Sequence, residues 1–170
     1  PAALLYGGNA VGGVVNTFDN RIPTKQIEGV QGSAETSLST ANDDRKGAFT
    51  VESGLGNVVL HADAFAEKSD DLRIPDFAHS ARQRALDDPN DVQPKKYLPN
   101  SDGSANGGSV GGSYFWDDNY AGLSLSSFDS NYGLVAEDGV RLKMDQKKLA
   151  FASEIKNLSG PIREVKVNFA

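Results

Sequence analysis

The feature that most constrains the fold is a two-residue alternation of apolar and polar side chains that returns in several segments. A period of two places successive side chains on opposite faces of a β-strand. In residues 58–67 one face of the predicted strand is formed by Val58, Leu60, Ala62, Ala64 and Ala66. The chain is therefore predicted to be all-β, with strands that have one apolar and one polar face.

This alternation predicts about seven strands, over residues 30–40, 46–55, 58–67, 111–117, 120–128, 140–145 and 162–169. Residues typical of turns separate them. The predicted connections are 42–46, 56–57, 68–105, 117–119, 130–139 and 157–161, so that every second one is tight. Transmembrane β-barrels have this asymmetry, with short turns at one end and larger loops at the other. We expect residues 68–105 to form one long, mobile loop with a helical turn near residues 82–86.

Composition narrows the function. The net charge of -6 and the pI near 4.9 argue against a nucleic-acid partner, because phosphate binding needs a basic surface. The chain has no cysteine, which excludes disulfides and thiolate metal sites. No apolar run approaches the ~20 residues of a membrane helix. Strands of a membrane barrel remain possible, since each has only about ten residues of alternating polarity.

Residues 1–23 are rich in glycine, with Gly7, Gly8, Gly12 and Gly13 close together. A phosphate-binding loop is not indicated, because neither GxxxxGK[ST] nor GxGxxG is present. Glycines at this density allow one backbone to approach another closely, as in a segment enclosed by other structure.

The run PAALLYGGNAVGGVVN, residues 1–16, resembles the end of the plug domain of TonB-dependent outer-membrane receptors, which closes on a pattern like RGP-x-x-LLYGS-x-A-x-GGV-[IV]-N. Gly8 stands where the family usually has serine. The Arg-Gly pair that precedes the proline is missing, so we expect a chain cut at its start.

The resemblance implies a fold and a function. Residues 1–23 are expected to end a plug domain, and residues 24–170 to form the first strands of an antiparallel transmembrane β-barrel that is larger and has 22 strands. Residues 68–105 are then a long extracellular loop. The implied function is import of a scarce nutrient (a metal ion, siderophore or haem-type iron complex) across a Gram-negative outer membrane, with energy from the TonB complex. The alternative is a soluble or surface-exposed β-sandwich that binds a ligand.

Several later phrases resemble the branch of the family that takes up zinc and iron complexes. They include VLHAD at residues 59–63 and KSDD, followed by Pro75, at residues 68–71. The His-rich loop expected near Gly133 is replaced here by Leu-Val-Ala-Glu, which departs from the zinc receptors.

Catalysis is not predicted, since two histidines in separate segments and no cysteine provide no local triad or HExxH motif. No cofactor is expected. His61 with Asp63 is a candidate metal site facing the barrel lumen, and a histidine hydrogen-bonded to the plug is the alternative. His79 with Asp76 is a candidate outer capture site, or else a solvated loop histidine. The paired acids at 43–44, 70–71, 87–88 and 117–118 are typical of solvated turns.

The alternation also predicts which residues share a face. The outward, lipid-facing set is Val58, Leu60, Ala62, Ala64, Leu123, Leu125, Val140 and Leu142, and the inward set is His61, Asp63, Arg141 and Lys143. With seven strands the sheet cannot close as an even-numbered barrel. We therefore expect an open, curved sheet with residues 1–20 against its concave polar face, and a chain that does not fold autonomously in water.

Overall fold

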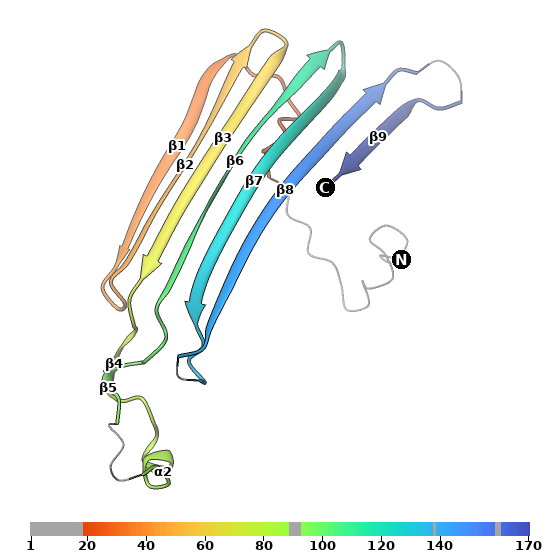
Figure 1. Ribbon diagram of the computed structural model, residues 1–170. Helices are drawn as coiled ribbons and strands as arrows, with labels where there is room; N and C mark the ends of the chain where they lie inside the picture. The colour runs from red at the N-terminus through yellow and green to blue at the C-terminus, as the bar shows by residue number, and fades with distance from the viewer. Residues whose placement is uncertain (1–18, 89–92, 138, 159–160) are drawn as a thin grey trace.

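The computed structural model describes residues 19–88, 93–137, 139–158 and 161–170. Residues 1–16, which carry the resemblance to a plug domain, lie outside this part. The described chain is all-β, apart from a single helical turn. Its main feature is one antiparallel sheet of seven strands, as the alternation predicts (Figure 1).

The seven strands lie in the order β1-β2-β3-β6-β7-β8-β9, and a second sheet contains only β4 and β5. Their bounds are β1 Gly29–Ser39, β2 Asp44–Leu55, β3 Val58–Ser69, β4 Arg73–Phe77, β5 Lys95–Tyr97, β6 Gly103–Trp116, β7 Asn119–Gly133, β8 Arg141–Lys156 and β9 Glu164–Phe169. Strands that follow one another in the large sheet are joined as simple antiparallel neighbours, with the small sheet inserted between β3 and β6.

The longest strands extend beyond their predicted bounds. β6 begins at Gly103, eight residues before the predicted start, and pairs with β3 from Gly103 to Tyr114. The first seven of these added residues, Gly103–Ser109, contain Gly, Ser, Ala and Asn but no large apolar residue. The period of apolar residues therefore cannot predict a strand in this segment. Its extended conformation is defined by backbone hydrogen bonds to β3.

Residues 70–102 form a small insertion and not a structureless loop. β4 and β5 pair within it, and the helical turn α2, Ala81–Arg84, lies at its tip (Figure 1). Ser80 caps this turn by accepting a hydrogen bond from the amide of Gln83 at 3.2 Å. The predicted helical turn is confirmed, and the prediction of a loop without strands is wrong. Strands of five and three residues are too short to show a period.

The two faces of the large sheet differ in polarity, as predicted for β3. Val59 and His61 are buried on one face, whereas Leu60 on the other face is 47% exposed. The register places Leu60, Leu123 and Phe151 side by side on that exposed face. We call the face with His61 the inner face and the face with Leu60 the outer face.

The predicted face of β8 is wrong at its first residues. Arg141 and Lys143 pair with Gly133 and Asn131 and lie on the outer face, and Leu142 lies on the inner face. The apolar outer residues of β8 begin only at Leu149. The sequence prediction placed Leu142 outward because it is apolar and its neighbours are charged. That rule fails here, since this part of β8 lies beyond the apolar outer surface.

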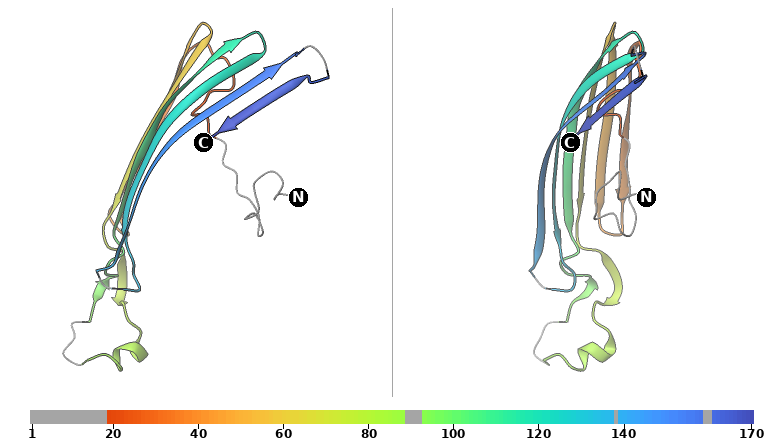
Figure 2. Two further views of the ribbon diagram at one scale, coloured as in Figure 1. Left: turned by 45° about the vertical axis from the view of Figure 1, so that its right-hand side comes forward. Right: turned by 90° about the vertical axis from the view of Figure 1, so that its right-hand side faces the viewer.

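The sheet is curved and open, as predicted. β1 and β9 are its two edges, and they do not pair with each other in the described part of the chain. Residues 19–28 lie on the concave side, which is the inner face (Figure 2). Pro23 in this segment is fully buried, so the segment packs against the sheet. We call residues 19–28 the connector.

The connections are sorted between the two ends of the sheet. One end has residues 40–43, the insertion at 70–102 and residues 134–140, and the other has residues 56–57, 117–118 and 157–163. The alternation of longer and tighter connections therefore holds for the first five of the six. It fails for the last, because β9 begins only at Glu164 and the predicted tight turn is as long as the connection before it. We call the end with the insertion the loop end and the opposite end the turn end.

Candidate functional site

The inner face has a polar cluster around His61. The imidazole Nδ1 lies 3.1 Å from Glu52 Oε1, and Nε2 lies 3.1 Å from Asp63 Oδ2. Glu52 faces His61 directly across β2 and β3, and Asp63 follows His61 by two residues on the same face. Each ring nitrogen therefore faces a carboxylate, and this orients the ring along the sheet.

The cluster also holds the connector. Arg21 Nε lies 3.8 Å from Asp63 Oδ2, and Asn20 donates a hydrogen bond from its amide to Glu52. On the sheet, Gln31 donates to Glu52 at 2.8 Å, and the Ser109 hydroxyl donates to Asp63. The carboxylates of Glu52 and Asp63 thus join His61 to a segment that lies outside the sheet.

Small residues on the inner face make room for the connector. A Cβ atom added at Gly111 would collide with the carbonyl oxygen of Arg21, and one at Gly54 would collide with that of Ile27. At Gly122 it would lie 2.5 Å from Cγ2 of Ile22. Glycine inside a strand allows another backbone to approach this closely. The connector is therefore seated by main-chain contact as well as by the polar cluster.

The predicted metal residues are only partly brought together. His61 and Asp63 are in contact, but Glu52 and Asp63 lie at opposite ring nitrogens and do not converge on one point. His79 pairs with Asp87 at 3.2 Å, and Asp76 pairs with Lys95 at 3.4 Å, so His79 and Asp76 do not form a site with each other. Within the described ranges, no three acidic or histidine side chains are grouped as a metal ion would require.

The outer face carries an apolar surface that is exposed to solvent over part of its length. Val110, Leu125 and Leu149 lie side by side in one row across β6, β7 and β8 and are each more than half exposed. Monomeric soluble proteins rarely expose large contiguous apolar patches, and such a patch marks a surface that a protein partner or a membrane covers.

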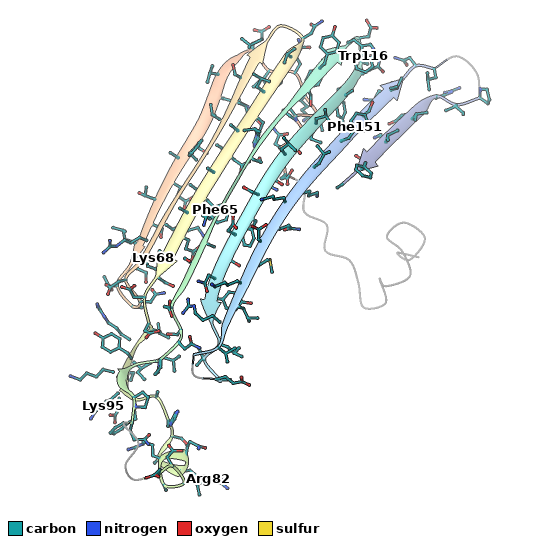
Figure 3. All side chains as sticks on the ribbon, in the orientation of Figure 1. Phe65, Lys68, Arg82, Lys95, Trp116 and Phe151 are labelled. Atoms are coloured by element: carbon teal, nitrogen blue, oxygen red, sulfur yellow. The ribbon has the colours of Figure 1, made fainter. Side chains whose placement is uncertain are left out.

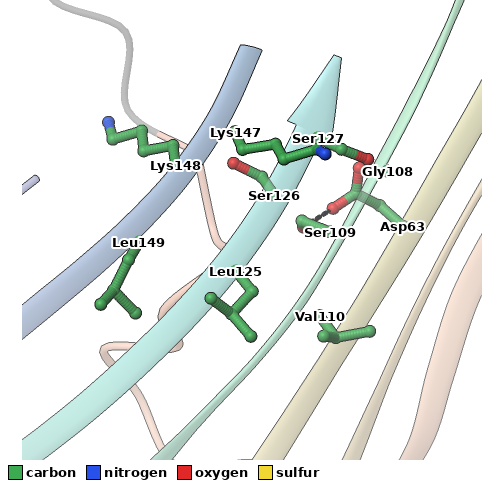
Figure 4. Close-up of a pocket in the computed structure, with 10 residues that line it drawn as sticks. All are labelled: Asp63, Gly108, Ser109, Val110, Leu125, Ser126, Ser127, Lys147, Lys148 and Leu149. Carbon is green, nitrogen blue, oxygen red and sulfur yellow. Dashed lines mark hydrogen bonds between the residues drawn. The ribbon is translucent and has the colours of Figure 1, made fainter. Parts of the chain in front are cut away.

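This row also borders a hollow of about 680 Å³, shown in Figure 4. Its remaining lining residues come from both faces of the sheet, among them Asp63 and Ser109 on the inner face and Lys147 on the outer face. A space bordered from both sides of a single sheet layer is not an enclosed site. We therefore assign it no ligand.

The apolar outer surface runs obliquely across the strands. Its outward residues span Val30–Leu38 on β1 and Leu149–Ile155 on β8, and the middles of these ranges lie at Ala34 and at the level of Ala152. The paired registers carry Ala34 to the level of Ser127 on β7, and the level of Ala152 to Gly122. The middle of the band thus moves five residues over five strand steps. We call this surface the apolar band.

This displacement has a geometric meaning. A shift of one residue per strand is ~3.3 Å along the strand for every ~4.8 Å across the sheet. This slope corresponds to an angle of roughly 35°. A flat apolar layer would cover such a band if the strands were tilted by that angle from the perpendicular to the layer, and strands in membrane barrels have this tilt.

Aromatic side chains lie at the turn end of the apolar band. Tyr114 and Trp116 stack on the outer face of β6, with ring centroids 6.0 Å apart, and Trp116 is the last residue before the turn (Figure 3). Aromatic residues of this kind are enriched where a barrel wall meets the lipid headgroups.

A comparison with protein-family models finds no match for this chain. No helix among the described residues is long and apolar enough to cross a membrane.

Sequence reasoning found His61 and Asp63 but missed Glu52 and Arg21. Glu52 lies in β2, where the alternation is irregular, and its proximity to His61 depends on the register of β2 with β3. Arg21 reaches the cluster only because the connector folds back over the sheet. Neither relationship has a signal in local sequence.

Proposed function

We propose that this chain is part of a TonB-dependent outer-membrane receptor: the end of the plug and the first seven strands of the barrel wall. In this role the outer face contacts lipid, and the inner face holds the connector that leads from the plug. The receptor imports a scarce nutrient, such as a metal ion, a siderophore or a haem-type iron complex.

The single observation that carries the proposal is the oblique apolar band. A soluble sheet that packs on a second sheet has its apolar residues where the partner covers them, with the strand directions of the two sheets within about 30° of each other. Nothing in that packing requires the apolar residues to be displaced by one residue from each strand to the next. A flat hydrocarbon layer crossed by tilted strands does require this displacement.

Two further observations support the same role. The stretch at residues 1–16 resembles the end of a plug domain, and it precedes a connector that is seated on the concave polar face. The first five connections alternate between a longer loop and a short turn, with the insertion at one end. Both fit a barrel wall that encloses a plug.

The alternative, a β-sandwich binding module, needs a second sheet over the outer face. The only other sheet in the described part is the pair β4 and β5, which lies beyond the loop end of the strands and does not cover this face (Figure 1). We therefore favour the membrane role.

The proposal is tested by locating the intact protein and measuring uptake. We expect it in the outer-membrane fraction, released by detergent but not by salt or alkaline carbonate. Uptake of radiolabelled zinc, a ferric siderophore or haem is compared between cells with and without the protein, and again in cells that lack TonB. Recovery in the soluble fraction contradicts the proposal. Uptake that is independent of TonB contradicts the energy coupling.

A further inference from the structure

The outer face carries a row of hydrogen-bond donors near the loop end, and this row meets the end of the apolar band on β2 and β3. In the strand register, Lys68 lies opposite Arg45 on β2 and opposite Ser104 on β6. The row continues to Asn131 on β7 and Lys143 on β8. Each of these five side chains is a donor, and three are cationic. On β3 the row follows directly after Ala66, the last apolar outward residue (Figure 3).

Arg45 and Lys68 form the densest positive charge in this row. They lie directly opposite each other on adjacent strands, and both are exposed. Like charges in that arrangement destabilise a sheet. Neither forms an ion pair with any residue that the structure describes. An anion between the two side chains would convert the repulsion into attraction.

Several acids near this pair have cationic partners of their own. Asp43 forms an ion pair with Arg73, and Asp102 forms a bidentate pair with Arg141. Asp129 and Asp145 lie on the outer face of β7 and β8, where Lys143 and Lys147 flank Asp145 along β8. Lys68 acts electrostatically on Asp102, but no carboxylate in the described part of the chain forms an ion pair with Arg45 or Lys68.

We propose that Arg45 and Lys68, with the Ser104 hydroxyl, bind the phosphate of an anionic lipid headgroup in the leaflet at the loop end. This inference rests on the proposed function, since it requires the apolar band to lie in a membrane. The position of these residues suits an anionic lipid. Its acyl chains would cover the apolar band, and its headgroup would lie at the level of Arg45 and Lys68.

The pair also suits phosphate chemically. A guanidinium donates two parallel hydrogen bonds to phosphate oxygens, and an ammonium adds a point charge. Ser104 is the next residue in the row and supplies a neutral donor. At the turn end, the connection between β6 and β7 contains Asp117 and Asp118 instead, so this central part of the sheet favours an anionic headgroup at the loop end.

The test uses a fluorescent probe next to the site. Ala66→Cys in the intact protein is labelled with bimane, since this chain has no cysteine of its own. The protein is placed in vesicles that contain brominated phosphatidic acid or brominated phosphatidylcholine, and quenching gives the relative binding of the two lipids. We expect a preference for phosphatidic acid that falls roughly fivefold for each cation removed, in Arg45→Gln and Lys68→Gln.

Lys46→Gln is the matched control. Lys46 is adjacent to Arg45 in β2 but lies on the inner face, where it pairs with Glu67 at 3.2 Å. Its loss should leave the preference unchanged. Equal quenching by the two lipids, unaffected by Arg45→Gln and Lys68→Gln, overturns the headgroup site while leaving the membrane-facing surface intact. A probe that neither lipid quenches overturns the membrane-facing surface, and the headgroup site with it.

Discussion

Asp102 and Arg141 form a bidentate ion pair that joins the end of the insertion to the first residue of β8, with N···O distances of 2.8 and 2.9 Å. Hydrogen bonds from Arg141 hold the pKa of the Asp102 carboxyl below its usual range. Because this pKa is lowered in the folded protein, the pair stabilises the fold above the ordinary carboxyl pKa of about 3.9. Its contribution is lost as pH falls through the lowered folded value.

We therefore expect Asp102→Asn to reduce stability at neutral pH by less than about 1 kcal/mol, because both side chains are partly exposed. Urea unfolding of the intact protein at about pH 7 and about pH 3 measures the effect. The difference between the two proteins should shrink as the pH falls below the ordinary carboxyl pKa of about 3.9. A difference of the same size at both pH values would show that Asp102 acts through something other than its charge.

Gly111 should be intolerant of a side chain. Gly111→Ala places a methyl group against the carbonyl oxygen of Arg21, so we expect a loss of ~1–3 kcal/mol or displacement of the connector. Gly47→Ala is the control, because a Cβ at that position meets nothing within 4 Å. Trypsin cleavage after Arg21 or Lys25 reports displacement. Equal cleavage of the two variants would contradict the packing of the connector on the inner face.

Leu60 should be sensitive to charge. It lies within the apolar band, so Leu60→Arg in the intact protein should lose ~2–4 kcal/mol if it is near the membrane midplane. Asn106→Arg is a control on the same face but beyond the band, and should cost much less. Stability is measured by unfolding from vesicles. If Leu60→Arg were as stable as Asn106→Arg, the band would not contact hydrocarbon.

The insertion should be the first place that an external protease cuts. Arg82 is exposed in α2, whereas Arg84 lies over the ring of Phe77, 3.9 Å from its centroid. Trypsin added to intact cells should therefore cleave after Arg82 before Arg84. Lys156 is exposed at the turn end and serves as the control for sidedness. Cleavage at Lys156 with protection of Arg82 would invert the proposed topology.

A water-soluble monomer is not expected for the 170-residue chain alone. β1 and β9 are unpaired edges, and the apolar band is exposed between them. Such edges and faces promote association in water. Light scattering of the purified chain in detergent-free buffer should detect aggregates. A monodisperse monomer with a sharp thermal transition would contradict the account.

Much of the sheet could be predicted from sequence because its outer residues alternate strictly. Leu60, Leu123 and Leu125 recur at period two, and their shared face follows from that period alone. The start of β6 could not be predicted in this way, since Gly103 and its neighbours bury no apolar side chain. Leu142 was assigned to the wrong face because its strand continues past the apolar band.

The inner-face cluster was less predictable for a different reason. His61 and Asp63 are neighbours on one strand, so their proximity follows from the period of two. Glu52 joins them only through the register of β2 with β3, and Arg21 only through the path of the connector. Contacts of this kind depend on tertiary structure, which local patterns do not encode.

The central claim is that the outer face meets lipid and the inner face does not. Single cysteines along β7, at residue 121 and at residues 123–126, test it most directly in the intact protein, because successive side chains there alternate between the faces. Each is labelled with bimane in vesicles that contain brominated lipid. We expect quenching at Ala121, Leu123 and Leu125 and none at Ser124 and Ser126. Uniform quenching, no quenching, or quenching confined to the even-numbered positions would contradict the account.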